Sequence, residues 1–463
     1  MSAVLDLAAY PLSAIQRQLW ALAQTGPAGS LAYNISLNLR VRGPLNRALL
    51  REAVQEAWNR HDALRTTIAA DGSGQTVHPA MKANARLVDL RNVPAELREA
   101  ALREEIAKNN HTPFDLARES SYRLRVYQLA DDEHLLMLTA HHILSDGWTL
   151  SLLLQEIAEL YASRYTGGLP DLVVPMQFGA FLAEESARVR EGRHARADRY
   201  WRDRLQAPLP LTELPLDFQR PRVRSFRADR AHAVLGAEYA PRLRALARQG
   251  GATLFMLLFA GFSALLHRIC RQERLLIGTP SAGRVVDGSD TLAGYCGSLL
   301  PICSEYSPGT GFIEHVKRAK SVLLEAYDHQ EFSFARLIDD LPLERTGNRA
   351  ALIDAIFNLE LPTPMPAIPG LRLKIETQAT PYTSYDLFFN VAEIDGELSL
   401  DLDYNLDVFR PETAEALLGS YKALLDHALA EPDAPVSALD LLGDHGRAVR
   451  ARFNDTARPR GGL

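Results

Sequence analysis

An imidazole, a carboxylate and a glycine stand close together near residue 140 of this chain. Residues 140–148 read AHHILSDGW and include His141, His142, Asp146 and Gly147. Imidazole can accept and return a proton near neutral pH, and glycine lets a substrate approach the backbone closely. The combination indicates proton-transfer chemistry rather than packing alone.

The flanking residues predict how these groups are positioned. Residues 134–139 form an apolar run typical of a buried strand, and residues 149–161 have the apolar spacing of a helix. Neighbouring residues of a strand point to opposite faces, so only one of the two histidines can face a given cavity. An isolated His-His pair would favour a structural role for both residues.

The whole string, His-His-x-x-x-Asp-Gly, resembles the central motif of the condensation domains of nonribosomal peptide synthetases. These domains form part of the acyltransferase superfamily that includes chloramphenicol acetyltransferase. Other segments resemble further family motifs in the same order, so the resemblance covers nearly the whole chain. These segments are residues 13–22, 60–66, 200–201, 214–221, 278–284 and 329–334, together with Arg345, Arg349 and Leu352 as a looser version of the last motif.

Two motifs depart from the family pattern. Residues 178–184 read FGAFLAE, where the family usually has Tyr-x-Asp-Phe-Ala-x-Trp. Residues 294–299 read GYCGSL, where the family has Gly-x-Phe-Val-Asn-Thr. We therefore expect an unusual donor rather than a peptidyl one. His141 replaces the Asp of a heterocyclisation domain, which argues against that reaction.

The resemblance implies a mixed α/β fold of two chloramphenicol-acetyltransferase-like lobes, a V-shaped pseudo-dimer with a central channel. We expect an N-terminal lobe at residues 1–175 and a C-terminal lobe at 176–445 that includes the crossover segment. The proline-rich stretch from Leu169 to about Arg230 is typical of such a connection. Residues 446–463 resemble a linker toward an adenylation domain, which also disfavours an epimerisation domain.

The resemblance further implies amide formation, in which the amine of an aminoacyl carrier protein attacks an acyl thioester. His142 is then the catalytic imidazole. Asp146 would be paired with Arg284 because burying its charge alone is costly, and Gly147 would border the channel. His141 has a structural role. Further candidates for lining the substrate channel are Trp148, Ser281 and Asn358.

The sequence has no phosphate-binding glycine loop and no metal-binding motif, so we expect no bound cofactor or metal. Phosphopantetheine-tethered or CoA thioesters would be substrates, with an acyl-CoA or an acyl carrier protein as donor. About a dozen residues precede the first motif. If Met1 is the native start, this favours a starter domain that N-acylates the first amino acid with a fatty acyl-CoA. The alternatives are a hybrid or internal domain with a polyketidyl or peptidyl donor, and a noncatalytic docking module for carrier proteins.

Composition is that of an ordinary enzyme. The 463 residues, 47% of them apolar and 23% charged, fit two domains of ordinary size. A net charge of −6 argues against a nucleic-acid partner. Arginines recur at helical spacing among acidic residues, which predicts one solvated helix face rather than a binding patch; they are Arg190, Arg193, Arg196, Arg199 and Arg202.

Three cysteines without CxxC spacing suggest neither a disulfide framework nor a zinc site. The apolar run at residues 254–266 is too short to span a membrane and predicts a buried core helix. The N-terminus has no basic region of a signal peptide. A reducing cytoplasm is the expected location.

Overall fold

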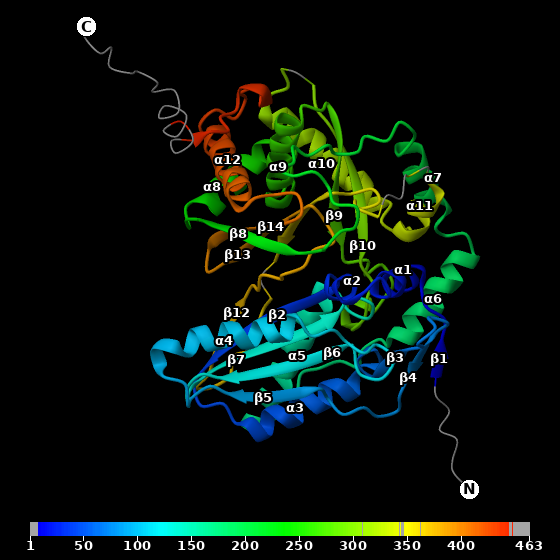
Figure 1. Cartoon of the computed structure of the whole chain (residues 1–463), viewed down its shortest axis with the longest axis vertical. Coiled ribbons are helices and arrows are strands. Elements are labelled where there is room, and N and C mark those ends of the chain that lie inside the picture. The colour runs from blue at the N-terminus through cyan, green and yellow to red at the C-terminus, as the bar shows by residue number, and fades with distance from the viewer. Residues whose placement is uncertain are drawn as a thin grey trace.

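The computed structural model describes residues 8–307, 309–341, 343, 347–361, 363–443 and 447. These residues form three sheets and their covering helices, arranged as a lower and an upper lobe (Figure 1). The mixed α/β prediction is confirmed. Arg345 of the last motif, Met1 and all of the predicted 446–463 linker except residue 447 lie outside the described residues.

The lower lobe is built mainly from the first part of the chain. Its main sheet has the order β12-β2-β7-β6-β5, and a small sheet has the order β1-β4-β3. The strands are β1 Ala8–Tyr10, β2 Asn34–Arg42, β3 Thr66–Ile68, β4 Gln75–Val77, β5 Ala85–Asp89, β6 Tyr122–Gln128, β7 Glu133–His141 and β12 Arg372–Glu376. The helices are α1 Ala14–Ala23, α2 Pro27–Leu31, α3 Arg47–Arg60, α4 Ala95–Asn110 and α5 Gly147–Thr166.

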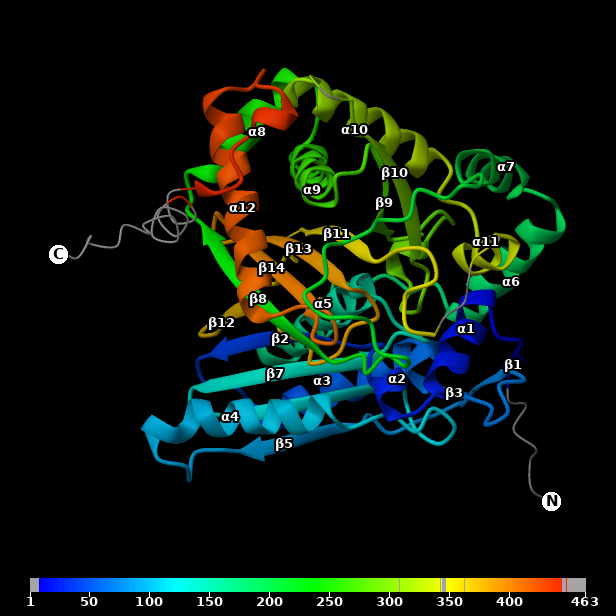
Figure 2. The ribbon, with the colours of Figure 1, turned by 45° about the horizontal axis from the view of Figure 1, so that its top comes forward.

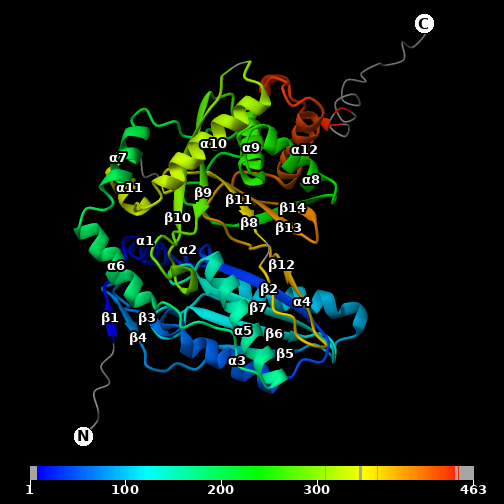
Figure 3. The same cartoon turned by 180° about the vertical axis from the view of Figure 1, so that it is seen from behind.

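The main sheet of the lower lobe is covered on both faces. Helix α4 lies over one face, and α3 and α5 lie over the other (Figures 1 and 3). Strand β7 is therefore buried along nearly its whole length, as its apolar sequence requires. The buried strand predicted at residues 134–139 and the helix predicted at 149–161 are confirmed as β7 and α5.

The upper lobe contains a six-stranded sheet with the order β10-β9-β11-β13-β14-β8. The strands are β8 Ala228–Leu235, β9 Arg274–Ser281, β10 Ser298–Glu305, β11 Ala355–Glu360, β13 Leu387–Ile394 and β14 Glu397–Asn405. The helices are α8 Tyr239–Gln249, α9 Leu254–Cys270, α10 Phe312–Asp328, α11 Phe334–Asp340 and α12 Pro411–Ala430. Helices α8, α9, α10 and α12 cover one face, and the other face turns toward the lower lobe (Figure 2).

Helix α9 is a core helix, as its apolar sequence predicted. Its residues from Met256 to His267 are all buried, and they belong to the main apolar cluster of the upper lobe. No single helix among the described residues has the length and apolar composition of a membrane span. Helices α8 and α9 have that length and composition only when taken together, and they are bent by 88° relative to each other.

The arginine-rich segment between the lobes differs from the prediction. It forms two helices, α6 Phe178–Arg190 and α7 Ala195–Arg204, not one. The chain turns between them at Gly192, whose φ of 70° is in the region that glycine adopts most readily. The arginines are exposed, as expected, but the break prevents them from forming one continuous face.

Strand β12 comes from the second part of the chain and completes the lower sheet. It pairs antiparallel with β2, from Arg372 opposite Arg42 to Glu376 opposite Asn38. An ion pair of 2.7 Å joins Arg40 to Glu376 on the same two strands. The division of the chain at residue 175 stays a prediction, and β12 is a later segment that reaches into the lower sheet.

Candidate functional site

His142 is the first residue after β7, and the backbone fixes its position. Its N–H donates to the carbonyl oxygen of Tyr33 at 2.7 Å, just before β2 begins. The side chain of Gln16 donates to the carbonyl of Ile143 at 3.0 Å and holds the following turn from α1. The imidazole is half-buried, and its ring centroid lies 5.7 Å from that of Tyr295 in an edge-on arrangement.

The hydrogen bond of the His142 ring determines which nitrogen carries the proton. Nδ1 lies 2.9 Å from the carbonyl oxygen of Ser145, and a carbonyl can only accept, so Nδ1–H donates. In the neutral ring Nε2 then keeps a lone pair, and no described residue donates a hydrogen bond to it. Burial lowers the pKa of His142, partly opposed by the Ser145 carbonyl and by Asp146. The ring is therefore a neutral acceptor near pH 7.

His141 faces the opposite way and is fully buried. Its Nδ1 accepts the N–H of Ile143 at 3.1 Å. Burial, with a smaller contribution from the neighbouring His142, lowers the pKa of His141 to about 3. Its ring thus stays neutral inside the lobe and supports the turn, which agrees with a structural role.

The pKa of His141 predicts that the protein loses stability in acid. An unfolded histidine titrates near pH 6.5, whereas folded His141 titrates near pH 3. Below pH 6.5 the unfolded state therefore binds a proton that the folded state does not, and unfolding becomes easier by about 1 kcal/mol per pH unit. Urea unfolding measured at pH 7, 6 and 5 checks this. In His141→Asn, whose side-chain oxygen can still accept from Ile143, the slope should be smaller; an unchanged slope contradicts the assignment.

Asp146 begins helix α5 as its N-cap. One carboxylate oxygen accepts from the backbone N–H of Thr149 at 2.8 Å and from the Thr149 hydroxyl at 2.7 Å. The backbone N–H of Cys296 also donates to Asp146, at 3.2 Å. An N-cap carboxylate satisfies helix N–H groups and interacts favourably with the helix dipole.

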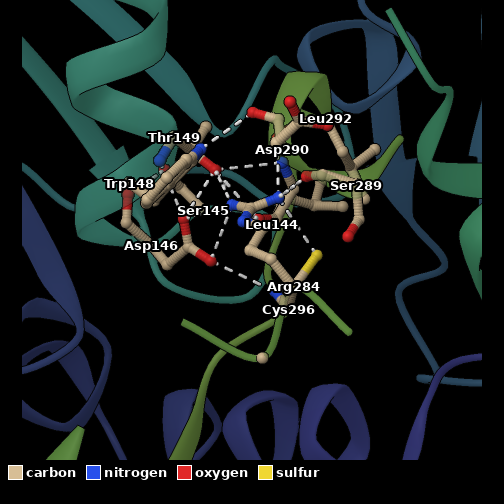
Figure 4. A network of polar contacts seen from close by, with 12 residues as sticks. Leu144, Ser145, Asp146, Trp148, Thr149, Arg284, Ser289, Asp290, Leu292 and Cys296 are labelled. Atoms are coloured by element: carbon tan, nitrogen blue, oxygen red, sulfur yellow. Dashed lines mark hydrogen bonds and ion pairs between the residues drawn. The ribbon is translucent and has the colours of Figure 1, made fainter. Parts of the chain in front are cut away.

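Arg284, in the loop that follows β9, pairs with Asp146 (Figure 4). Its Nη2 donates to both carboxylate oxygens of Asp146, at 2.9 and 3.0 Å, and only 6% of its side chain is exposed. Its Nη1 donates to the backbone carbonyls of Leu292 and Ser289 at 2.7 and 3.1 Å. The buried pair therefore ties the start of α5 to the loop that follows β9.

Other residues of the predicted motifs hold the middle of α5 and the start of α6. Glu156, on α5, pairs with Arg60 at 2.8 Å and with His61 at 3.0 Å. The carboxylate of Asp62 accepts the N–H groups of Phe178 and Gly179, at 2.7 and 2.9 Å, and so caps helix α6. The second motif is thus a positioning element for α5 and for α6, the first helix of the segment between the lobes.

Gly147 is the first residue of α5 and is exposed. A Cβ atom built at this position has no atom within 4 Å, so the space beside it is open. In the first turn of α5, no described residue accepts the N–H of Gly147 or Trp148. The N-terminal end of a helix carries partial positive charge, so these N–H groups can stabilise negative charge that develops beside them.

The open space at Gly147 predicts opposite effects of small and large side chains. Gly147→Ala should fold normally and keep most of its activity, because a methyl group meets nothing. Gly147→Trp should lower turnover at least about tenfold by filling the open space, which the sequence resemblance predicts to border the substrate channel. Steady-state rates and melting temperatures of both variants check this. Undiminished turnover in Gly147→Trp would refute the placement of Gly147 beside the substrate.

The three remaining channel candidates have separate positions. Trp148 is 47% exposed, and its indole N–H donates to the carbonyl of Asp290 at 3.0 Å. Ser281, at the end of β9, is buried and donates to the side chain of Gln330. Asn358, on β11, donates to Asn390 at 2.8 Å. Neither Ser281 nor Asn358 forms a hydrogen bond with His142 or Asp146, so their contact with substrate stays a prediction.

Sequence reasoning missed several residues of the site. Tyr33 supplies a backbone carbonyl, and no side-chain pattern announces such a contact. Thr149 joins Asp146 to Gly294, because its hydroxyl donates to Asp146 and accepts the N–H of Gly294 at 3.1 Å, but in the sequence it reads only as part of a helix. Tyr295 belongs to a recognised motif segment, which was the available signal for its position beside His142.

Comparison with known proteins identifies similar chains over nearly the whole length. The family model described as "Condensation domain" matches residues 7–449. The chain is 32% identical over 455 residues to a linear gramicidin synthase of Brevibacillus parabrevis, covering 96% of this chain and 6% of the relative. It is 33% identical over 445 residues to phosphinothricin tripeptide synthetase PhsC of Streptomyces viridochromogenes, covering 93% of this chain and 40% of the relative.

Solved structures share the fold. The X-domain from teicoplanin biosynthesis matches with a TM-score of 0.80 and 25% identity, over 93% of this chain and 97% of that one. The starter condensation domain of rhizomide synthetase RzmA, in complex with C8-CoA, matches with a TM-score of 0.82 and 19% identity, over 94% and 98%. The pseudo-dimeric, chloramphenicol-acetyltransferase-like architecture is the one these structures have.

Proposed function

The chain belongs to the condensation-domain family, and from that premise we propose that it joins an acyl thioester to the amine of an aminoacyl group on a carrier protein. The product is an amide, and the phosphopantetheine arms are tethers of the substrates. Because the chain spans less than half the length of these relatives, its carrier proteins and an adjacent adenylation domain are partners in the proposal.

One observation carries the proposal: the ring of His142 is locked as a neutral acceptor. Nδ1–H donates to the carbonyl oxygen of Ser145, with 2.9 Å between nitrogen and oxygen, so the lone pair on Nε2 is available to an amine N–H. The free N–H groups at the start of α5 supply partial positive charge within the same turn. An acceptor for nitrogen's proton and a site for negative charge on oxygen are the two needs of amide formation.

The reaction balances with these groups. The amine nitrogen attacks the thioester carbonyl carbon, and the C–N bond forms as negative charge builds on oxygen. His142 Nε2 takes a proton from nitrogen, the C–S bond breaks, and the proton goes to the leaving thiolate. A free α-amine has a pKa of about 7.7 to 8.0, so part of it is already uncharged at neutral pH. Alignment of the two tethered reactants contributes about 7 kcal/mol or more.

For the donor we propose a fatty acyl-CoA, which makes the domain a starter that N-acylates the first amino acid. The unusual residues at 178–184 and 294–299 support a donor other than a peptide. The fold is shared with a starter domain solved in complex with C8-CoA, although the likeness extends to the fold alone. An internal or hybrid domain with a carrier-bound donor is the alternative within the same chemistry.

Intact-protein mass spectrometry tests the proposal. A carrier protein loaded with an amino acid is incubated with this chain and with acyl-CoAs of increasing chain length. A mass gain of one acyl group, lost in His142→Ala, supports a starter acyltransferase. A gain only with an acyl carrier protein as donor supports the internal or hybrid alternative.

A noncatalytic docking module is the second candidate. The observation in its favour is that the X-domain from teicoplanin biosynthesis, which shares this fold at 25% identity, is also solved in complex with OxyB. In this case no donor in the mass-spectrometry experiment should transfer an acyl group, and the carrier protein should still bind. Any transfer that depends on His142 excludes the docking module as the sole function.

A further inference from the structure

A buried arginine lies where the crossover segment meets the loop before β13. Arg224 is 8% exposed, and its Nη1 donates to the carbonyl of Ser384 at 2.7 Å. The two segments are joined further along, where Thr383 N–H donates to the carbonyl of Phe226 at 2.8 Å. The guanidinium carbon of Arg224 lies 5.2 Å from the centre of the Phe226 ring. The arginine is therefore held in a defined place.

The other edge of this guanidinium has no hydrogen-bond partner among the described residues. Nε and Nη2 of Arg224 are both inaccessible to solvent and both unpaired there. Nε–H and Nη2–H point the same way and form the fork that binds both oxygens of a carboxylate. Leaving a buried charge uncompensated is costly, so the arrangement predicts an anion in the functional state.

Arg224 and His142 have neighbouring tyrosines in common. Burial raises the pKa of Tyr33, and the positive charge of nearby Arg224 partly opposes that rise. The carbonyl of the same Tyr33 accepts the backbone N–H of His142 at 2.7 Å. On the other side, Tyr385 lies within electrostatic reach of both Arg224 and Tyr295, and Tyr295 contacts the His142 ring. Tyr33 and Tyr385 are therefore neighbours of Arg224, and the Tyr33 backbone and Tyr295 are in turn neighbours of His142.

We propose that Arg224 is a specificity-determining residue that binds a carboxylate on the side chain of the acceptor amino acid. This rests on the proposed function, in which the donor is a fatty acyl group and the acceptor is the amino acid. The carboxylate of an aspartyl or glutamyl group lies a few bonds from the reacting amine. The phosphate of phosphopantetheine is separated from the thioester by the length of the arm, which fits a site this near His142 less well.

Binding must displace a side chain that covers the fork, since neither nitrogen is accessible. Phe226, the neighbour of the guanidinium, has a φ of 60°, which bulky residues rarely adopt. The contacts between the two segments hold this conformation. Because the loop is fixed in this way, the Nε and Nη2 groups of Arg224 should keep their position while a covering side chain moves.

Acceptor specificity tests the inference. The rates kcat/KM are measured for carrier proteins loaded with glutamate, aspartate, glutamine and asparagine, using the wild type and Arg224→Met. The wild type should prefer each acid over its amide by about 10- to 100-fold, the range expected of a hydrogen bond to a charged group. Arg224→Met should lose this preference and still process the amides. Arg222→Met, an exposed arginine of the same loop, should behave as the wild type.

Acceptors carried on N-acetylcysteamine, which lacks the phosphate, separate the two anion sources. A preference for acids that persists with them and depends on Arg224 supports the side-chain carboxylate. An effect of Arg224→Met that appears only with carrier-bound acceptors, and equally for acids and amides, assigns the fork to the phosphate and overturns the proposal. A wild type without any preference overturns it as well.

A binding measurement keeps this result separate from the proposed function. Calorimetry compares the dissociation constants of glutamic acid α-methylamide and glutamine α-methylamide, which cannot act as thioesters. Tighter binding of the acid, lost in Arg224→Met, supports the carboxylate site even if no acyl transfer is seen with any donor. Equal dissociation constants for the glutamic acid and glutamine derivatives contradict the carboxylate site, whether or not the chain is active.

Discussion

Replacing His142 with alanine should reduce amide formation by about 10² to 10⁴-fold without unfolding the protein. The ring is half-buried, and among the described residues its only hydrogen bond is to the Ser145 carbonyl, so its loss removes the Nε2 acceptor and little packing. The turn remains held by the His142 backbone N–H, which alanine retains. Single-turnover acyl transfer to an aminoacyl carrier protein gives the rate, and circular dichroism with a melting curve verifies the fold.

A histidine outside the site provides the control for this variant. His111 is exposed at the end of α4, and His111→Ala should react at the wild-type rate. His142→Gln should also be slow, because an amide side chain is too weak a base to take the amine proton. A His142→Ala protein that keeps a near-wild-type rate would show that alignment alone drives the reaction, and the proton-accepting role would be wrong.

Replacing Asp146 with alanine should lower both activity and stability. Its carboxylate caps α5 and neutralises Arg284, and 11% of the side chain is exposed. Removing one partner of a buried ion pair costs about 3 to 5 kcal/mol because the other charge is left uncompensated. The turn that carries His142 would also lose its anchor. Chemical denaturation measures the stability loss, and kcat measures the effect on the site.

Two further variants separate charge pairing from capping. Arg284→Met in the Asp146→Ala background removes the unpaired charge and should recover part of the lost stability. Asp146→Asn keeps one oxygen as an N-cap and should lie between the wild type and Asp146→Ala. Asp290→Ala, an exposed carboxylate nearby, should change neither property. If the double variant is as unstable as the sum of the single ones, Asp146 and Arg284 are not energetically coupled.

The elements around the site could be predicted from sequence because their signals are local. The run before His142 has the composition of a strand buried on both faces, and the spacing after Gly147 is helical, so β7 and α5 were found. The β13–β14 hairpin also has a local signal, Asp395-Gly396, and these two residues occupy the turn with φ of 53° and 85°. Each of these depends on residues that are neighbours in the chain.

What failed or was missed depends on contacts between distant residues. The Tyr33 carbonyl accepts the N–H of His142, more than a hundred positions later in the chain. Every residue has a backbone carbonyl, so residue types cannot indicate which one acts as the acceptor. Arginine spacing predicted one helix through residues 190–202, which was wrong. The periodicity of the arginines is the same whether or not the chain turns at Gly192 between them. The pairing of Arg284 with Asp146 was expected only through the family resemblance, since spacing alone could not bring residues so far apart together.

Strand β12 also determines when the lower sheet can be completed during synthesis of the chain. Until the ribosome has made residue 376, the lower sheet ends at β2, with an unpaired row of backbone groups along residues 38–42. Until residue 284 has been made, Asp146 also lacks its partner Arg284. The nascent N-terminal lobe thus exposes an unpaired strand edge, which favours aggregation or chaperone binding. Expression of residues 1–175 alone should therefore give insoluble protein, whereas the whole chain closes its own edge.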